Sequence, residues 1–230
     1  TDMAHACGDL VIIAQILANG FRLSRRRVGM PGKFNADNAL AALAVCTLAL
    51  SGGSGVLDDH TKQAILGSLV KVRVDGRMEI AHVSKKCSVI VDYAHNAVSM
   101  ESLLTTLRDY HPKRLVCVFG CGGNRARDRR YSMGEIGGKM ADLCIITADN
   151  PRFEKNEDII KDIEVGLAKT DGTYLVIPDR REAIFYAIRN AEEGDMIAII
   201  GKGHEDYQEI EGVKHHFLDR EVVEEAVNNV

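Results

Sequence analysis

Residues 143–168 read LCIITADNPRFEKNEDIIKDIEVGLA, and this stretch contains the unit from which the fold is built. The apolar run at 143–146 is typical of a buried strand. The run stops abruptly, and an acid, an amide, a proline and an arginine follow at 149–152. Asn156, followed by the acids Glu157 and Asp158, then opens an amphipathic segment, which predicts a helix with Asn156 as its N-cap.

The same order of strand, polar break and helix or turn recurs from about Lys85 to the end of the chain. Short apolar runs occur at 88–91, 115–119, 143–147, 174–177 and 196–200. A second helix start is marked by Asp179 as N-cap, with Glu182 three residues later, before the sequence AIFYAIRNA. This alternation predicts an α/β fold, a Rossmann-like, mostly parallel sheet with flanking helices.

Polar clusters follow all five predicted strands. They read DYAHN, GCGGNR, ADNPR, PDRRE and GKGHE, in chain order. Each cluster alone is explained by an ordinary turn or helix cap. In a parallel sheet, however, the five strand ends lie on one edge, where such folds bind ligands, so we expect the five clusters to converge there.

The chemistry of these clusters indicates a ligand that carries both charges. Backbone amides of Gly122 and Gly123 could meet an anion, because glycine lets the backbone approach closely. Arg125 and Arg152 suit carboxylates, and Glu205 suits an ammonium group. An amino acid has both groups. The residues by themselves lead no further than an amino-acid-like ligand on a sheet edge.

The first part of the chain has a different pattern of apolar and polar residues. Residues 35–50, NADNALAALAVCTLAL, are apolar on nearly every face, which predicts a helix buried in a larger body. Residues 57–72 predict a second, amphipathic helix, and short strands with a Pro/Gly turn are expected in 20–34. This region has too little apolar sequence of its own to form a compact domain.

Composition excludes several classes of protein. A formal charge of −4 gives no reason to expect nucleic acid or an anionic membrane as partner. The apolar stretch at 10–18 is too short to span a membrane and lacks the basic start of a signal peptide. Six irregularly spaced cysteines are typical of buried thiols, so we expect a cytoplasmic protein. No zinc spacing, no catalytic triad spacing and no G-x-x-x-x-G-K-[ST] phosphate loop occurs in the sequence.

Eight motifs, in this order and at these separations, resemble the Mur ligases, and the resemblance extends from Gly32 to the end. They are GKFNADNALAALA, DGRMEI, VDYAHN, FGCGGNR, TADNPR, DRREAI, GKGHEDYQ and FLDRE. DNPR and GKGHE together resemble the members that add the third residue of the peptidoglycan stem peptide. The resemblance implies the helical end of the central ATPase domain in residues 1–84 and the C-terminal amino-acid-binding domain in residues 85–230.

The reaction that the resemblance implies uses ATP to form an acyl phosphate on UDP-N-acetylmuramoyl-L-alanyl-D-glutamate. The amine of meso-diaminopimelate then attacks, and positioning and charge stabilisation contribute most to the rate. Mg²⁺ is implied as well. Because the chain does not begin with methionine, we expect it to be a piece of a longer protein, with the phosphate loop and most Mg²⁺ ligands before Thr1.

The roles implied for single residues fall into two groups, with no catalytic residue and no metal ligand assigned within these 230 residues. The residues near ATP are Asn35, Asn38, Asp92 and His95; for Asn35 a helix cap is the alternative. The residues that hold the incoming amino acid are Arg125, Asn150, Arg152, Gly201 and Glu205. Asp149 and Pro151 are expected to shape the turn, and Lys202 and His204 are left without a role.

Two departures from the family pattern leave alternatives open. Asn96-Ala97-Val98 stands where many members have Thr-Pro-Asp, and Asn124 and Ala126 replace two acids in the glycine-rich turn. A non-catalytic amino-acid or nucleotide-binding module derived from the family is one alternative. A lysine-adding form of the ligase is the other.

Overall fold

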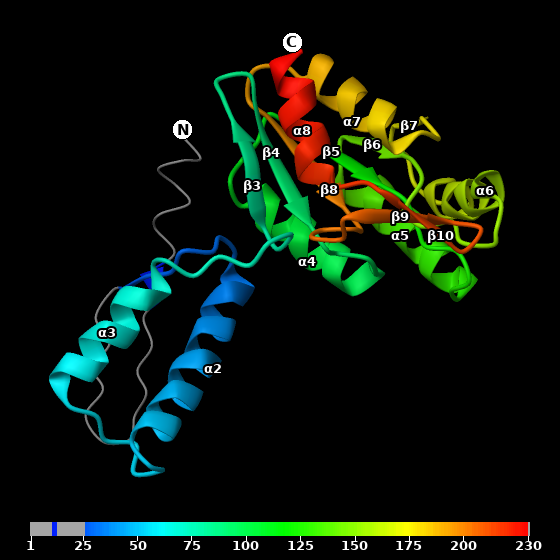
Figure 1. The fold of residues 1–230 in the computed structure, drawn as a ribbon. Helices are drawn as coiled ribbons and strands as arrows, with labels where there is room; N and C mark the ends of the chain where they lie inside the picture. The colour runs from blue at the N-terminus through cyan, green and yellow to red at the C-terminus, as the bar shows by residue number, and fades with distance from the viewer. Residues whose placement is uncertain (1–10, 13–25, 230) are drawn as a thin grey trace. The chain divides into compact units, whose positions relative to one another are not determined.

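The computed structural model describes residues 11–12 and 26–229 (Figure 1). The contacts divide the chain into two compact units, Thr1–Val74 and Asp75–Val230. This division lies ten residues before the expected boundary at 84/85, because β3 (Glu79–Val83) pairs with the sheet of the second unit.

The described residues of the first unit form two helices and a short strand pair. Its elements are β1 (Val11–Ile12), β2 (Arg26–Arg27), α2 (Lys33–Leu50) and α3 (Asp59–Leu69), with β1 and β2 antiparallel. The predicted second helix is confirmed as α3, which is capped by Asp58 through the backbone N–H of Thr61 (2.9 Å). The rest of the strand region expected before residue 26 lies outside the described residues.

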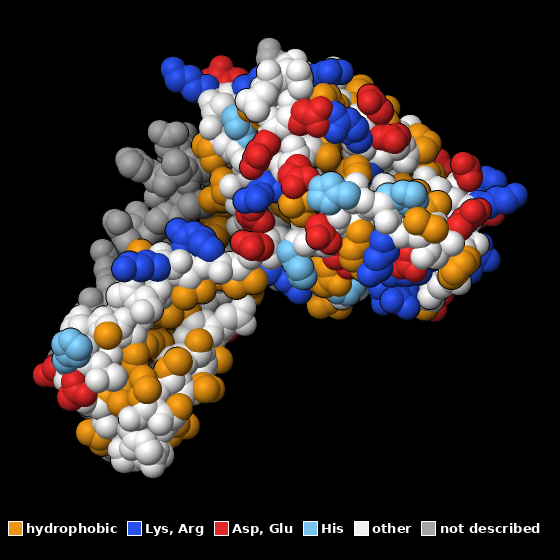
Figure 2. All heavy atoms as spheres, viewed as in Figure 1, with side chains coloured by type: hydrophobic (Ala, Val, Ile, Leu, Met, Phe, Trp, Pro, Cys, Tyr) orange, Lys and Arg blue, Asp and Glu red, His pale blue; other side chains and the backbone are white. Residues whose placement is uncertain are grey.

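Helix α2 forms where predicted, and its burial in a larger body stays a prediction. Its buried side chains form one stripe of Asn35, Ala39 and Leu43, spaced four residues apart. Val45 is 66% exposed and Leu48 53% exposed, and hydrophobic side chains gather over α2 and α3 in Figure 2. The physical reason is that the described residues supply a partner for only one face of this helix.

A six-stranded sheet organises the second unit, in the order β3-β4-β8-β5-β6-β7. The five predicted strands are confirmed, and all are parallel, while β3 is an antiparallel edge strand that the sequence analysis did not predict. The five are β4 (Cys87–Asp92), β5 (Arg114–Phe119), β6 (Leu143–Ile146), β7 (Tyr174–Val176) and β8 (Asp195–Ile200). β9 (Tyr207–Ile210) and β10 (Val213–His216) form a separate hairpin.

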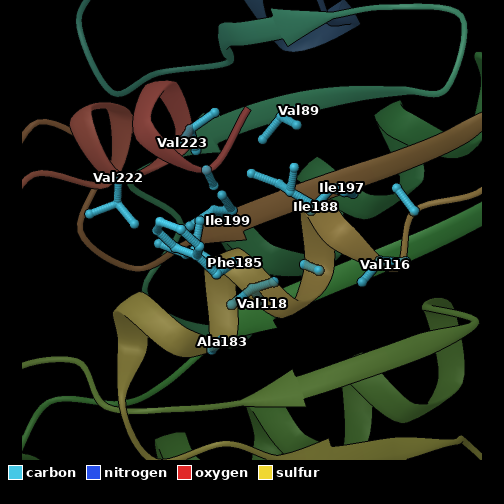
Figure 3. Packing of buried hydrophobic residues seen from close by; sticks show 14 of the residues in the cluster. Val89, Val116, Val118, Ala183, Phe185, Ile188, Ile197, Ile199, Val222 and Val223 are labelled. Atoms are coloured by element: carbon cyan, nitrogen blue, oxygen red, sulfur yellow. The ribbon is translucent and has the colours of Figure 1, made fainter. Parts of the chain in front are cut away.

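Helices cover both faces of this sheet, giving three layers (Figure 1). On one face lie α4 (Ala97–Arg108), α5 (Arg127–Met140) and α6 (Asn156–Leu167); on the other lie α7 (Arg180–Arg189) and α8 (Asp219–Asn228). Figure 3 shows Phe185 and Ile188 of α7 and Val223 of α8 packed on the strands. No helix among the described residues is long and apolar enough to cross a membrane.

Only one of the two predicted helix starts is right in detail. Asp179 caps α7 by accepting the backbone N–H of Glu182 (2.9 Å). At α6, in contrast, Lys155 is the N-cap and Asn156 is already the first helical residue, so the predicted cap is wrong by one position. The Asn156 side chain instead donates to the carbonyl oxygen of Pro178 (3.5 Å).

Asp162 of α6 connects this helix to α5, and its charge should make stability depend on pH. Its carboxylate accepts hydrogen bonds from Arg127 (2.9 Å for both oxygens) and from the buried Arg130 (3.0 Å). Burial acts to raise the pKa of Asp162, but the hydrogen bonds from the two arginines outweigh it and the pKa is lowered. The stabilisation is therefore present above the unfolded-state pKa of about 3.9 and is lost as pH falls through the lower folded-state value.

We expect Asp162→Asn to lower the free energy of unfolding at pH 7 by about 1–3 kcal/mol, since hydrogen bonds to charged groups are lost. Urea unfolding of both proteins between pH 7 and pH 3 should show the difference shrinking below about pH 4. Asp158→Asn on the same helix is the matched control. Asp158 is exposed, and its ion pair with the exposed Lys161 (3.5 Å) should contribute little to stability. A difference that does not change with pH would contradict the role given to the Asp162 charge.

Candidate functional site

A cavity of about 270 Å³ lies at the carboxyl ends of four neighbouring strands, β4, β8, β5 and β6. It is lined by Tyr93, His95, Gly120, Cys121, Gly122, Arg125, Arg129, Asp149, Asn150, Arg152, Gly201 and Glu205. Four of the five polar clusters therefore meet, and all five residues predicted to hold an amino acid lie in the cavity wall. The fifth cluster, PDRRE, does not line this cavity, but its Arg180 reaches the same edge of the sheet and donates to the carbonyl oxygens of Ile200 and Ala148.

The glycine-rich turn after β5 packs tightly against the loop after β6. A Cβ atom on Gly123 would overlap the carbonyl oxygen of Pro151, which explains why glycine is needed there. The backbone N–H of Gly123 donates to the carbonyl oxygen of Asn150 (2.9 Å). The expectation that this amide meets an anion is therefore wrong, because packing of the two loops uses it.

Arg152 is held in one place by contacts that the sequence analysis missed. Its Nε donates to a carboxylate oxygen of Glu209 (3.1 Å), and its Nη1 donates to the carbonyl oxygen of Gly123 (2.8 Å). Its backbone, at φ 53°, also bonds to Glu209 and Glu211 of the hairpin region. The β9–β10 hairpin thus fixes the guanidinium at the cavity wall. Glu209 is the residue that follows the GKGHEDYQ motif, but no sequence signal pairs it with Arg152.

Glu205 is the centre of a second set of contacts across the cavity. Asn150 Nδ2 donates to one of its carboxylate oxygens (2.8 Å), and the Tyr93 hydroxyl donates to the other (3.2 Å). Burial, followed by the neighbouring Glu205 carboxylate, raises the pKa of Tyr93, so this hydroxyl keeps its proton at neutral pH. Tyr93 stands in the quoted VDYAHN motif, yet nothing in the sequence indicated its contact with Glu205.

Both signs of charge face the cavity. Arg125, Arg129 and Arg152 supply cations, and Asp149 and Glu205 supply carboxylates. Burial raises the pKa of Asp149, although the nearby Arg180 and Lys202 act to lower it. Gly201, at φ 113°, passes so close to Asp149 that a Cβ atom would lie 2.8 Å from its carboxylate oxygen. Gly201 is thus required by the backbone conformation and by Asp149 as well as lining the cavity.

The residues predicted to lie near ATP have the following contacts. Asp92 is buried, and its carboxylate accepts the backbone N–H groups of Met78 and Ala94 (both 2.7 Å), while burial raises its pKa. His95 lines the cavity, with its ring centroid 4.7 Å from that of Tyr93.

In the first unit, Asn35 donates to the carbonyl oxygen of Pro31 (2.6 Å) and accepts from Asn38 (3.1 Å). Gly32 is the N-cap of α2, so the alternative of a cap at Asn35 is wrong. The assignment of Asn35, Asn38, Asp92 and His95 to the ATP site remains a prediction.

The two departures from the family pattern have local structural roles. Asn96 caps α4 by accepting the backbone N–H of Ser99 (2.9 Å). Asn124 adopts φ 54°, a conformation that asparagine tolerates, and bonds to Glu154 and Phe153 in the loop after β6. Within residues 11–12 and 26–229, no three His, Cys, Asp or Glu side chains are grouped to hold a metal ion.

Comparison with known proteins gives one consistent result. Residues 76–203 match the family described as "Mur ligase, glutamate ligase domain". The chain is 43% identical to proteins named UDP-N-acetylmuramoyl-L-alanyl-D-glutamate–2,6-diaminopimelate ligase from Clostridioides difficile (strain 630) and Aquifex aeolicus (strain VF5). The matches cover 88% and 96% of the chain but 40% and 45% of those proteins, so the chain spans less than half of their length.

Solved structures agree with this result. A structure of a ligase with the same name aligns with a TM-score of 0.66 and 35% identity, over 90% of this chain and 40% of that one. A UDP-N-acetylmuramate-alanine ligase from Thermotoga maritima has the same fold, with a TM-score of 0.63 and 20% identity, over 92% of this chain and 41% of that one. With more than half of its residues matched by the family and this fold in common, the chain belongs to the Mur ligase family.

Proposed function

We propose that these residues are the C-terminal part of an ATP-dependent ligase that adds meso-diaminopimelate to UDP-N-acetylmuramoyl-L-alanyl-D-glutamate in peptidoglycan synthesis. The names of the curated relatives support this proposal. Residues 1–84 would then belong to the central ATPase domain, and residues 85–230 to the amino-acid-binding domain. We infer a cytoplasmic location from the UDP-linked substrate.

The observation that carries the proposal is the pair of opposite charges in one small cavity. Arg152 and the Nδ2 group of Asn150 offer hydrogen-bond donors. Glu205, which lines the same cavity and contacts Asn150, offers a carboxylate acceptor. The distal end of meso-diaminopimelate has both a carboxylate and an ammonium group, which match these donors and this acceptor. Lysine has only the ammonium group, so the lysine-adding alternative leaves Arg152 without a ligand carboxylate.

ATP and Mg²⁺ are the cofactors that the Mur ligase family uses. We place Asn35 and Asn38 beside the adenine, and Asp92 and His95 near the nucleotide. ATP would activate the substrate carboxylate as an acyl phosphate. The residues of this cavity would hold the amino acid with its attacking amine directed out of the cavity. This positioning would lower the barrier to attack on the acyl phosphate.

The test is an assay of the complete gene product that contains these residues. We expect it to join meso-diaminopimelate to the UDP-linked dipeptide in the presence of ATP, and to release phosphate in proportion. The 230 residues alone should release no phosphate, because their sequence has no G-x-x-x-x-G-K-[ST] loop. A complete protein that uses only lysine, or no amino acid, would contradict the proposal, as would turnover by the 230 residues alone.

A further inference from the structure

Lys202, in the GKGHE motif, is a buried lysine that the proposed function does not use. Its side chain is 0% exposed. Its Nζ donates to Asn150 Oδ1 (3.3 Å) and to the carbonyl oxygen of Tyr207, and lies 3.6 Å from a carboxylate oxygen of Glu205. One ammonium group therefore connects the loop after β6, the loop after β8 and the hairpin. Burying it costs desolvation, which lowers its pKa and calls for a compensating role.

The contacts of the Asn150 amide, with Lys202 among them, leave it only one orientation. Oδ1 accepts from Lys202 and from the backbone N–H of Glu209 (2.9 Å), and both of these groups can only donate. Nδ2 faces the Glu205 carboxylate, which can only accept (2.8 Å). A flipped amide would place its NH₂ group against two donors and its oxygen against a carboxylate, so all three contacts would become repulsive.

We propose that Lys202 is a positioning residue that acts through Asn150 to select the ligand. By holding Oδ1, it turns the amide NH₂ group toward Glu205 and the cavity, so Asn150 can donate to a ligand but cannot accept from it. The amide then recognises an acceptor, such as a carboxylate, beside Arg152. The identity of that ligand as meso-diaminopimelate rests on the proposed function, whereas the orientation of the amide does not.

The orientation can be tested on the 230-residue chain without any ligand. In ¹⁵N-labelled protein, the side-chain NH₂ signals of Asn150 are those that disappear in Asn150→Ala. We expect Lys202→Met to shift these signals or bring them together. Lys86→Met is the control and should leave these signals unchanged. Lys86 Nζ likewise donates to a backbone carbonyl, that of Arg189 (3.0 Å), but Lys86 precedes β4 and so lies at the opposite end of this strand from the cavity. Unchanged Asn150 signals in folded Lys202→Met protein would overturn the proposal.

The consequence for selection is tested in the complete ligase by a double-mutant cycle. Lys202→Met should lower kcat/KM for meso-diaminopimelate about tenfold, mainly through KM. The reason is that the charged hydrogen bond that holds the Asn150 amide oxygen is lost. In an Asn150→Ala background, the same change should cost less than about twofold, because the group through which Lys202 acts is absent. Equal losses in both backgrounds would mean a merely structural lysine and would overturn the proposal.

Asn150→Asp provides a test that leaves Lys202 in place, should Lys202→Met fail to fold. It keeps an oxygen for Lys202 and Glu209 but puts a second oxygen against Glu205. We expect kcat/KM for meso-diaminopimelate to fall about tenfold or more. Unchanged kcat/KM in this variant would overturn the proposal. If the complete protein uses no diaminopimelate while the amide signals respond to Lys202→Met, the proposed function fails and the positioning role stands.

Discussion

Arg180→Met should lower the free energy of unfolding by about 3–5 kcal/mol, since it leaves a buried carboxylate without its partner. Arg180 begins α7 and Asp219 begins α8, and both side chains are 0% exposed. Nε and Nη2 of Arg180 donate to the two carboxylate oxygens of Asp219 (2.8 and 2.7 Å). The same guanidinium donates to the carbonyl oxygens of Ile200 (3.0 Å) and Ala148 (3.3 Å), at the ends of β8 and β6.

The neighbouring residue provides the control. Arg181 also joins α7 to α8, through Glu225, but both side chains are more than 40% exposed. Water already solvates this pair, so Arg181→Met should cost at most about 1 kcal/mol. The double variant Arg180→Met, Asp219→Leu should recover most of the stability lost in Arg180→Met, because no buried charge remains unpaired. Urea unfolding followed by circular dichroism measures all of these. Equal losses at Arg180 and Arg181, or no recovery in the double variant, would contradict this account.

The sheet could be predicted because its strands carry their own signal. Each of the five parallel strands is a short apolar run that ends in a turn, and four of them have no exposed residue, so local sequence and final burial agree. The hairpin has no such signal. Its strands YQEI and VKHH are mostly polar, and its two-residue turn is Glu211-Gly212, both at positive φ, where Asn-Gly is the usual indicator.

The site could be predicted at the level of strand ends but not at the level of contacts. Parallel topology places Arg125, Asn150, Arg152 and Glu205 on one edge whatever their rotamers, so their convergence followed from the strand assignment. The groups that orient them lie far away in sequence. Glu209 is 57 residues from Arg152, and Tyr93 is 112 residues from Glu205. No local pattern records such pairs, since they depend on how the hairpin and two loops pack.

The departures at Asn96 and Asn124 illustrate the same limit. From the sequence they were losses, of a Thr-Pro-Asp turn and of two acids. In the structure each asparagine satisfies backbone groups in its own loop, as an N-cap at Asn96 and in a positive-φ turn at Asn124. Both asparagines are thus compatible with the loops around the cavity, while Ala126, the N-cap of α5, makes no side-chain hydrogen bond in place of the lost acid.

Arg152 should decide between diaminopimelate and lysine. Two of its nitrogens are used by Glu209 and Gly123, which fix the guanidinium while Nη2 has no partner among residues 11–12 and 26–229. A distal carboxylate would gain a charge-assisted contact from this group, and lysine would leave it unpaired in a partly desolvated wall. The loss of one charged hydrogen bond costs about 1.5–3 kcal/mol, so Arg152→Ala should lower kcat/KM for meso-diaminopimelate by roughly 10- to 150-fold.

Lysine use should change much less in Arg152→Ala, or should rise. Glu205→Ala is the control, because a carboxylate that holds an ammonium group common to both amino acids should affect both when it is lost. The measurement is kcat/KM for each amino acid in the complete ligase, for the wild type and the two variants. Arg152 and Glu205 are held by different partners, the hairpin and the pair of Asn150 and Tyr93, so the variants should report on separate halves of the cavity. If the wild type prefers lysine, or if Arg152→Ala weakens both amino acids equally, Arg152 does not bind the distal carboxylate and the lysine-adding form becomes the better proposal.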